Sequence, residues 1–386
     1  MTAPRTVTVV GAGVIGAAIA WNLTRRQDST LRVLLIDTHL PMIGATPYSA
    51  GILRRHHTLP SDVELAAESL TAYRRFREVV GGPSGYTPTG FLLVLGEHST
   101  EDAAVNRKVI DSVGSATELL DLAALRRRFP HMQFAGGEFG VLETDGGYGS
   151  AAETALSYRA GFVANGGMPM LGVRVDRVDR QADRWLLNTN IGELATDELV
   201  LAAGADTARL GRHIDLQLPV TPRRIGLAVV RTPRDVAAGP VVIDDVTGTY
   251  FVPRTDGSVA VGVRARPECP QTLPAEPLTA AEIAEAITRG AQRVPAFSDA
   301  PLTGTQAACD GYTPDARPIL GPVEDLPGLH LACGFSGGGY KMAPAVGAYV
   351  AAGVIGDCCP DRIGPYNVRR FARQTLLEPE RPYGYL

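Results

Sequence analysis

The sequence predicts a mixed α/β fold, in which a parallel-sheet domain is interleaved along the chain with a domain built on an antiparallel sheet. A strand–helix–strand pattern opens the chain, and residues 218–263 alternate like an antiparallel sheet with Pro and Gly at the turns. The chain closes with a strand, a Gly-rich turn and a long apolar helix. The expected domains are discontinuous: the first covers 1–85, 146–217 and 310–386, and the second covers 86–145 and 218–309.

The opening strand–helix–strand unit carries a glycine pattern that is typical of dinucleotide binding. Residues 6–10 form an apolar strand, and Gly11, Gly13 and Gly16 follow it where a helix begins. The first glycine permits a tight turn, the second lets backbone N–H groups approach a pyrophosphate, and the third lets the helix pack closely on the strand. The next strand ends at Asp37, whose carboxylate can accept hydrogen bonds from a ribose hydroxyl.

The same glycine pattern also occurs in strand–helix turns that bind no nucleotide. The strand before it, the helix after it and the acidic residue beyond favour a dinucleotide, because the N-terminus of the helix, at Val14 and Ile15, attracts phosphate. A nicotinamide dehydrogenase would continue with further strand–helix repeats. This chain instead passes into irregular and mixed structure, and it returns near residue 170 with a small meander that leads to residues 198–204. This arrangement favours a flavin.

Composition and charge exclude several other classes. Hydrophobic residues make up 45% and charged residues 20%, as in a globular chain, and the net charge of −4 is too small to indicate a nucleic-acid or membrane partner. The longest uncharged run, 342–356, is too short and Gly-rich to span a bilayer. The five cysteines show no disulfide framework, and Cys358 and Cys359 are expected as reduced thiols in the cytoplasm. No Cys, Asp or Glu cluster completes a ligand set with His56 and His57, so no metal is expected.

Four segments in order along the chain carry a resemblance to a known family. They are the N-terminal glycine pattern, residues 200–206 (VLAAGAD), residues 313–321 (TPDARPILG) and residues 334–341 (GFSGGGYK). Together they resemble the D-amino-acid oxidase family of FAD enzymes, above all its sarcosine and glycine oxidases, over nearly the whole chain. The resemblance implies a Rossmann-like FAD domain and a substrate domain whose antiparallel sheet covers the flavin.

The resemblance also implies an activity. The family oxidises the C–N bond of an amino acid or N-substituted amino acid by hydride transfer to FAD, water hydrolyses the imine, and H₂O₂ is released when oxygen accepts the electrons. One alternative is removal of an N-carboxymethyl arm from a larger amine or hydrazine-type substrate, with glyoxylate as product. A second alternative is an amino-acid dehydrogenase with another acceptor, and a third, from a different class, is a non-catalytic or tRNA-modification flavoprotein. The oligomeric state stays open.

Site residues follow from the resemblance position by position. Arg55 falls where sarcosine oxidases place a carboxylate-binding arginine, and Lys341 falls at the partner lysine. Tyr250 resembles a pocket tyrosine, and Arg264 lies near the place of a pocket histidine, where it would suit an extra acidic group on the substrate. The residues expected to contact FAD are Gly11, Gly13, Val14, Ile15, Gly16, Asp37, Ser49, Ala50, Gly51, Val175, Ala203, Gly204, Gly337, Gly338, Gly339, Tyr340 and Lys341.

The sequence departs from the sarcosine oxidase pattern at several positions, among them the histidine and arginine of the flavin loop, which are replaced most nearly by Tyr48 and Ile52. Two departures bear on the cofactor link and on oxygen. Those enzymes attach FAD to a cysteine shortly before the TPD motif, but here Ala308 occupies the matching position and Cys309 follows it. We therefore expect non-covalent FAD. A lysine that activates oxygen in those enzymes has its nearest match in Ala260, so we expect weak use of oxygen unless Arg264 supplies the missing charge.

Overall fold

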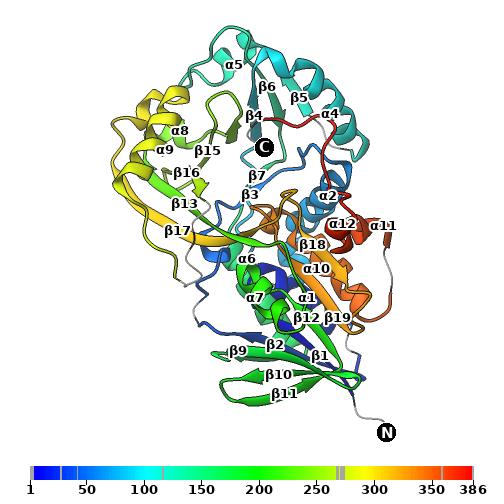
Figure 1. Cartoon of the computed structure of the whole chain (residues 1–386). Helices are drawn as coiled ribbons and strands as arrows, with labels where there is room; N and C mark the ends of the chain where they lie inside the picture. The colour runs from blue at the N-terminus through cyan, green and yellow to red at the C-terminus, as the bar shows by residue number, and fades with distance from the viewer. Residues whose placement is uncertain are drawn as a thin grey trace.

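The computed structural model describes residues 4–26, 28–40, 42–114, 117–266, 269, 274–357 and 360–384. Cys358 and Cys359, which are expected as thiols, lie outside the described residues. Two large sheets organise the described part of the chain, one in the lower and one in the upper half of Figure 1. The fold is the predicted mixture of a parallel and an antiparallel sheet.

The lower sheet is mainly parallel, with β1 at its centre. Its order is β18-β19-β12-β1-β2-β8, and among these neighbours only β18 and β19 run antiparallel. The apolar strand before the glycine pattern is therefore buried between two neighbours, as parallel strands normally are. The strands are β1 (Arg5–Val10), β2 (Leu31–Asp37), β8 (Met168–Leu171), β12 (Glu198–Leu201), β18 (Ile319–Pro322) and β19 (Leu329–Cys333).

Helices cover one face of this sheet, and a small sheet covers the other. On the helical face α1 is buried along its whole length and packs against α6 and α10. A Cβ on Gly347 of α10 would lie only 2.7 Å from Ala18 Cβ, so the absence of a side chain lets α1 and α10 approach closely. The other face carries Trp185, which is 1% exposed. The elements are α1 (Val14–Thr24), α2 (Pro60–Arg74), α6 (Ala151–Ala164), α10 (Gly339–Val354), and, on the other face, α7 (Thr207–Arg212), β9 (Val175–Gln181), β10 (Arg184–Thr189) and β11 (Gly192–Thr196).

The upper sheet is mainly antiparallel, with the order β17-β13-β16-β15-β14-β4-β6-β5. Only β14 and β4 pair in parallel. Two hydrophobic clusters fill its two faces, and α5 and α9 contribute to one of them. The strands are β4 (Phe91–Leu95), β5 (Thr117–Leu120), β6 (Phe139–Glu143), β13 (Thr221–Arg231), β14 (Val241–Asp244), β15 (Thr249–Pro253), β16 (Ser258–Arg266) and β17 (Leu302–Tyr312).

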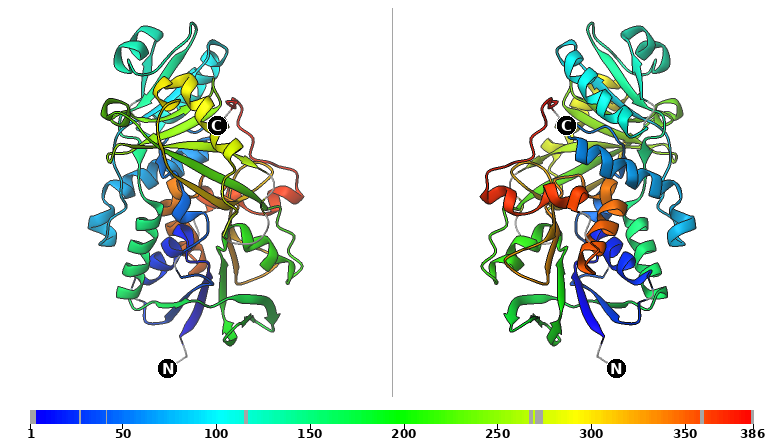
Figure 2. Two further views of the ribbon diagram at one scale, coloured as in Figure 1. Left: turned by 90° about the vertical axis from the view of Figure 1, so that its left-hand side faces the viewer. Right: turned by 90° about the vertical axis from the view of Figure 1, so that its right-hand side faces the viewer.

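The remaining elements join or flank the two sheets. They are β3 (Ile52–Leu53), β7 (Gly147–Tyr148), α3 (Phe76–Val80), α4 (Thr100–Ser112), α5 (Leu122–Arg128), α8 (Arg234–Ala237), α9 (Ala280–Arg293), α11 (Pro360–Ile363) and α12 (Arg369–Ala372). The C-terminal segment, red in Figures 1 and 2, runs from α12 back to the antiparallel sheet, where Asn106 Nδ2 donates to Arg381 O at 3.0 Å. In the described ranges, no helix combines the length and hydrophobicity needed to cross a bilayer.

The chain passes between the two sheets several times. The strands of the antiparallel sheet come from residues 91–143 and 221–312, and those of the parallel sheet come from the segments before, between and after. We propose a division into two interleaved domains along these sheets. The domain limit drawn at 309/310 then falls inside β17, which continues from the antiparallel sheet toward the parallel one.

Candidate functional site

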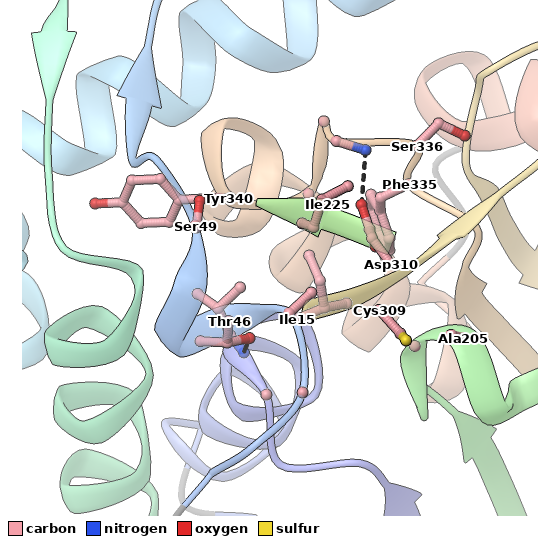
Figure 3. A pocket seen from close by; sticks show the side chains of 18 of the residues that line it. Ile15, Thr46, Ser49, Ala205, Ile225, Cys309, Asp310, Phe335, Ser336 and Tyr340 are labelled. Carbon is pink, nitrogen blue, oxygen red and sulfur yellow. Dashed lines mark hydrogen bonds between the residues drawn. The ribbon is translucent and has the colours of Figure 1, made fainter. Parts of the chain in front are cut away.

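A cavity of about 920 Å³ lies between the two sheets, and residues of both sheets line it. We use two names for parts of its surface. The nucleotide wall consists of Gly11, Gly13, Asp37 and Val175 with their neighbours, and the cationic wall consists of Arg54, His57 and Lys341. Figure 3 shows Ile15 and Thr46 on one side of the cavity, with Asp310, Phe335 and Ser336 on another.

Backbone geometry shapes the nucleotide wall. Gly11 has a φ of 106°, and a Cβ at this position would lie 2.3 Å from Ala202 O, so only glycine fits. The backbone N–H of Val14, in the first turn of α1, donates to Thr46 Oγ1 at 3.1 Å. A Cβ on Gly13 would lie 2.9 Å from the same hydroxyl oxygen, so the loop passes close to residue 46. The N-terminus of α1 thus lines the cavity, with the Thr46 hydroxyl beside it.

Asp37 lines the nucleotide wall, whereas Gly16 has a packing role behind it. Asp37 Oδ2 accepts a hydrogen bond from Ala12 N at 2.7 Å, and Oδ1 accepts one from His39 N at 3.0 Å. The carboxylate lines the cavity and also fixes the glycine loop. Gly16 does not line the cavity. A Cβ on it would lie 1.8 Å from Gly11 O, so this glycine serves the packing of α1 on β1.

The structure brings nearly all the residues expected at FAD to one cavity, although their contact with FAD stays a prediction. Besides Gly16, each of them lines it, and these residues are Gly11, Gly13, Val14, Ile15, Asp37, Ser49, Ala50, Gly51, Val175, Ala203, Gly204, Gly337, Gly338, Gly339, Tyr340 and Lys341. The Tyr340 hydroxyl donates to Ser84 O at 3.2 Å, on the buried side of the helix. Tyr340 therefore contributes its ring to the cavity while its polar atom is bonded elsewhere.

The two neighbouring arginines after β3 point to different places. Arg55 does not line the cavity: its Nη2 forms an ion pair with Asp145, and its Nε lies 3.9 Å from Glu143 Oε2. Glu143 also accepts the backbone N–H of Arg55 at 2.9 Å. Arg54 lines the cavity instead. Of the two arginines, Arg54 and not the expected Arg55 therefore lines the cavity.

Arg54 is a buried cation with unused hydrogen-bonding groups. It is 8% exposed, and its Nε and Nη1 have no hydrogen-bond partner among the described residues. Its guanidinium lies 5.5 Å from the centre of the Phe91 ring. Burial lowers the pKa of Arg54 to about 10, which leaves it charged at neutral pH. An unpaired buried guanidinium is costly unless an anion binds to it, so this residue marks an anion site.

The charge of Arg54 affects two further cavity residues, His57 and Lys341. His57 Nε2 is buried without a partner among the described residues, and burial together with Arg54 lowers the pKa of His57 well below 6.5. Lys341 Nζ donates to Gly337 O at 3.0 Å. Burial, and then the charge of Arg54, lower the pKa of Lys341 to about 7. The cationic wall therefore holds one permanent charge, a neutral imidazole and an amine that titrates near neutrality.

Carboxylates near this wall are already partly engaged. Asp62, which is 1% exposed, forms an ion pair with Arg317 (Nε to Oδ2, 2.5 Å) and accepts the Tyr366 hydroxyl at 2.7 Å. Burial raises the pKa of Asp62 above its ordinary value. Because Arg317 and Tyr366 hold this carboxylate, it leaves the Arg54 guanidinium available to a ligand.

Tyr250 and Arg264 line the cavity from the antiparallel sheet. A Cβ on Gly262 would lie 2.1 Å from Tyr250 Cε1, so this glycine makes room for the tyrosine ring. Arg264 is exposed, near the end of β16. Ala260 is completely buried in the sheet and does not line the cavity, so no cation faces the cavity from that position.

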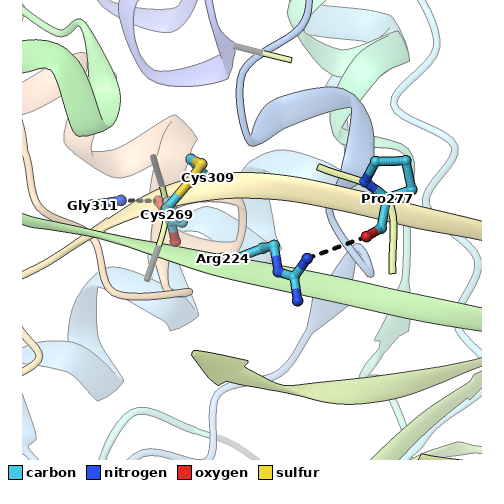
Figure 4. Close-up of a disulfide and its surroundings, with 6 residues drawn as sticks. Arg224, Cys269, Pro277, Cys309 and Gly311 are labelled. Atoms are coloured by element: carbon cyan, nitrogen blue, oxygen red, sulfur yellow. Dashed lines mark hydrogen bonds between the residues drawn. A yellow bond between two sulfur atoms is a disulfide. The ribbon is translucent and has the colours of Figure 1, made fainter. Parts of the chain in front are cut away.

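A disulfide joins Cys269 to Cys309, contrary to the expectation that the cysteines would be unpaired (Figure 4). The two Cα atoms are 6.1 Å apart, within the normal range for a disulfide. Arg224 of β13 pairs in register with both Cys309 of β17 and Arg266 of β16. Cys309 thus lies in β17, whereas Cys269 comes after the end of β16, which is not a direct neighbour of β17 in the sheet. Sequence spacing hid the bridge because it depends on this arrangement of the strands.

The sequence reasoning did not identify four polar residues that line the cavity: Arg54, His57, Thr46 and Asp310. Arg54 and His57 had a signal, since they belong to the Arg-Arg-His-His run, but a loop gives no rule for which side chains turn inward. Asp310 had a signal in its place before the TPD motif. Thr46 had none. In the described part of the chain, no group of three His, Cys, Asp or Glu side chains is placed to hold a metal ion.

Comparisons with known proteins agree with this architecture. The family model described as "DAO: FAD dependent oxidoreductase" matches residues 6–352. Glycine oxidase from Geobacillus kaustophilus (strain HTA426) is 25% identical over 98% of this chain and 100% of that protein. FAD-dependent oxidoreductase domain-containing protein 1 from Bos taurus is 25% identical over 95% of this chain and 84% of that protein.

Solved structures show the same fold. A crystal structure of glycine oxidase from Geobacillus kaustophilus has a TM-score of 0.84 and 25% identity, covering 96% of this chain and 99% of that one. L-proline dehydrogenase from P. horikoshii has a TM-score of 0.88 and 21% identity, covering 97% and 99%. The fold is therefore shared with these proteins.

Proposed function

The chain belongs to the DAO family of FAD-dependent oxidoreductases, and from this premise we propose that it oxidises the C–N bond of an amino acid or an N-substituted amino acid. Membership makes it an oxidoreductase with FAD as cofactor. The observation that supports the substrate class is Arg54, a buried cavity arginine with Nε and Nη1 unpartnered among the described residues. A substrate carboxylate is the anion that suits it.

The residues of the cavity fit FAD. Glycine at position 11 lets the loop turn tightly against the backbone of Ala202, and the N-terminus of α1 lines the cavity, where it would hold the pyrophosphate. Asp37 and Val175 would hold the ribose and adenine, and the turn at residues 336–339 would meet the flavin ring. When bound, FAD supplies an acceptor for the hydride that leaves the substrate.

We assign the carboxylate contact to Arg54 and Lys341, in place of the predicted pair of Arg55 and Lys341. Arginine can offer two parallel N–H groups to a carboxylate, and the lysine ammonium adds a compact charge. Both side chains line the cavity, whereas Arg55 is tied to Asp145 outside it. Fixing the carboxylate in this way orients the neighbouring C–N bond, and Tyr250 would limit the position of the substrate from the antiparallel sheet.

The same charges prepare the substrate amine. The nitrogen must be neutral when the hydride leaves, because its electron pair forms the new C=N bond. Arg54 and protonated Lys341 disfavour a third positive charge nearby, so they lower the pKa of a bound ammonium group. His57 adds no charge, because burial and Arg54 keep its imidazole neutral. Under this proposal the site needs no dedicated general base.

We propose that FAD is bound without a covalent link. Ala308 offers no nucleophile at the expected attachment position, and the sulfur of Cys309 is engaged in the disulfide. Acid precipitation should release all yellow colour to the supernatant. Colour that stays with the precipitated protein would overturn this part of the proposal.

We propose weak use of oxygen, with H₂O₂ as the product when oxygen is reduced. In sarcosine oxidases the cation that stabilises superoxide is expected at the strand position that Ala260 occupies here, and Ala260 brings none to the cavity, while Lys341 is assigned to the substrate carboxylate. Dye reduction should therefore outpace peroxide release. Equal rates of the two, unchanged in Arg264→Ala, would contradict this proposal, and absence of any peroxide would favour a dehydrogenase with another acceptor.

Removal of an N-carboxymethyl arm is a second candidate, supported by Arg264. Arg264 places an exposed cation on the side of the cavity formed by the antiparallel sheet. A substrate with a second acidic group would therefore have a partner there. One experiment separates the candidates: an anaerobic screen of amino acids, N-alkyl amino acids and N-carboxymethyl amines, in which bleaching of the flavin absorbance reports reduction. Bleaching by none of these classes would refute the proposed function.

We also propose a cytoplasmic location, on the composition of the chain. The disulfide between Cys269 and Cys309 bears on this proposal, because cytoplasmic thiols reduce accessible disulfides. Cys309 is only 6% exposed, which shields its sulfur. Cell fractionation with an antibody to the full chain tests the location, and enrichment outside the cytoplasm would contradict it.

A further inference from the structure

The turn that is expected at the flavin ring depends on the end of β17. Four hydrogen bonds connect the turn to β17 and the residue after it. Ser336 N donates to Gly311 O at 3.0 Å, Thr313 N donates to Ser336 Oγ at 3.1 Å, the hydroxyls of Thr313 and Ser336 are 3.4 Å apart, and Gly337 N donates to Asp310 Oδ2 at 2.8 Å. The last of these is the bond drawn at Asp310 in Figure 3. Among these bonds, it is the one that involves an ionisable side chain.

The turn needs such support because its backbone is unfavourable. Ser336 and Gly337 have φ values of 51° and 84°, so two consecutive residues are left-handed, and the first of them is not glycine. Both polar groups of the Gly337 residue are bonded to side chains. Its N–H donates to Asp310, and its carbonyl oxygen accepts from Lys341 Nζ at 3.0 Å. An acid and a base therefore hold the same residue from two sides.

The charges around Lys341 make Asp310 important for it. Arg54 and His57 face Lys341 from the segment after β3, Asp62 faces it from α2, and Asp310 faces it from β17. Burial and Arg54 lower the pKa of Lys341, whereas Asp310 and Asp62 raise it. Asp62 is already paired with an arginine, whereas the oxygens of Asp310 accept the backbone N–H groups of Gly311 and Gly337.

We propose that Asp310 is a positioning residue with two effects: it holds the 336–339 turn in shape, and it keeps the Lys341 ammonium charged for the substrate carboxylate. This inference rests on the proposed function for its second effect only. The two effects predict different results for two substitutions. Asparagine carries no charge but can still accept a hydrogen bond from the Gly337 N–H. Alanine carries no charge and cannot accept this bond.

The test uses the full-length protein with FAD and acetate as the probe for a substrate carboxylate. Acetate binding is measured between pH 6 and 9 by the perturbation of the flavin absorbance. In the native protein, affinity is greatest below pH 7, where Lys341 is protonated, and falls as the pH rises through about 7. In Asp310→Asn the fall should occur about one pH unit lower, which makes acetate binding about fivefold weaker at pH 7 and about tenfold weaker at pH 8.

Retention of FAD provides the second readout. Asp310→Asn should bind FAD about as tightly as the native protein, whereas Asp310→Ala should bind it at least tenfold more weakly, because the turn loses its anchor. Asp299→Asn, at an exposed acid, is the matched control and should change neither readout. Lys341→Met should abolish the pH dependence of acetate binding.

The outcomes separate this inference from the proposed function. An unchanged pH profile in Asp310→Asn would refute the effect on Lys341, and normal FAD affinity in Asp310→Ala would refute the effect on the turn. If acetate fails to bind the native protein at any pH, the carboxylate site of the proposed function is wrong and the charge effect falls with it. The FAD measurement still decides the effect on the turn in that case.

Discussion

At the nucleotide wall the chain presents backbone N–H groups and glycines, whereas at the cationic wall it presents buried side-chain charges. Gly11 and Gly13 are needed because they have no side chain: any Cβ there would meet Ala202 O or Thr46 Oγ1. Arg54 and Lys341 contribute their charges. Burial lowers the pKa values of both, and the charge of Arg54 lowers that of Lys341 further. A wall of the first kind depends on local conformation, and one of the second kind depends on the whole tertiary structure.

Among the substitutions considered, a change at Gly13 in the nucleotide wall should have the largest effect, which is on FAD binding. In Gly13→Asp the new side chain would crowd Thr46 Oγ1 and place a negative charge at the N-terminus of α1, where phosphate is expected. We expect no retention of FAD, measured by the ratio of flavin to protein absorbance after purification. Gly136→Asp is the control, since a Cβ there has no neighbour within 4 Å. Retained FAD in Gly13→Asp would show that phosphate binds elsewhere.

The pair Arg54 and Arg55 offers the sharpest test of the cationic wall. Arg54→Ala should weaken transition-state binding of amino-acid substrates by about 2–5 kcal/mol, the scale of removing one buried charged partner. Amines without a carboxylate should be affected far less. Arg55→Ala should leave kcat/KM nearly unchanged but lower the melting temperature, because the buried Glu143 loses the neighbouring guanidinium and Asp145 keeps only Arg74 as an ion-pair partner. The reverse pattern would return the carboxylate site to Arg55.

Reduction of the disulfide should have an intermediate effect, on stability alone. The bridge closes a loop with a sequence separation of 40 residues, for which chain entropy predicts about 2–4 kcal/mol of stabilisation. Dithiothreitol should lower the melting temperature of the native protein by several degrees and leave that of Cys269→Ser unchanged. Titration of denatured protein should show two additional thiols after reduction. The same thiol count before and after would show that the bridge is absent.

Arg264→Ala should have the smallest effect. Arg264 is exposed, so solvent screens its charge, and we expect an increase in KM of only a few fold, about 0.5–1 kcal/mol, confined to substrates with a second acidic group. Steady-state kinetics with matched mono- and dicarboxylic amines measures this difference. An equal change for both kinds of substrate would exclude a role in selecting dicarboxylates.

The contrast between the walls also explains what sequence reasoning achieved. The glycine loop could be predicted because the turn, the helix start and Asp37 are close in sequence and each follows from backbone geometry. Arg54 could not be distinguished from Arg55, since they are adjacent and only the tertiary packing of Asp145 and Glu143 decides which one turns away. The disulfide required knowledge that β13 lies between β16 and β17.

The central place of β1 in the parallel sheet has a consequence for synthesis of the chain. β1 is made before the other strands of this sheet, but its neighbour β12 follows only at Glu198–Leu201, and β19, on the same side, begins at Leu329. Pairings between such distant segments form slowly, and the unpaired strand edge stays open to aggregation until they do. The cofactor cavity can be completed only after the residues that follow β19, such as Lys341, have been made. Expression at low temperature with chaperone support and a supply of flavin should therefore raise the yield of folded holoprotein.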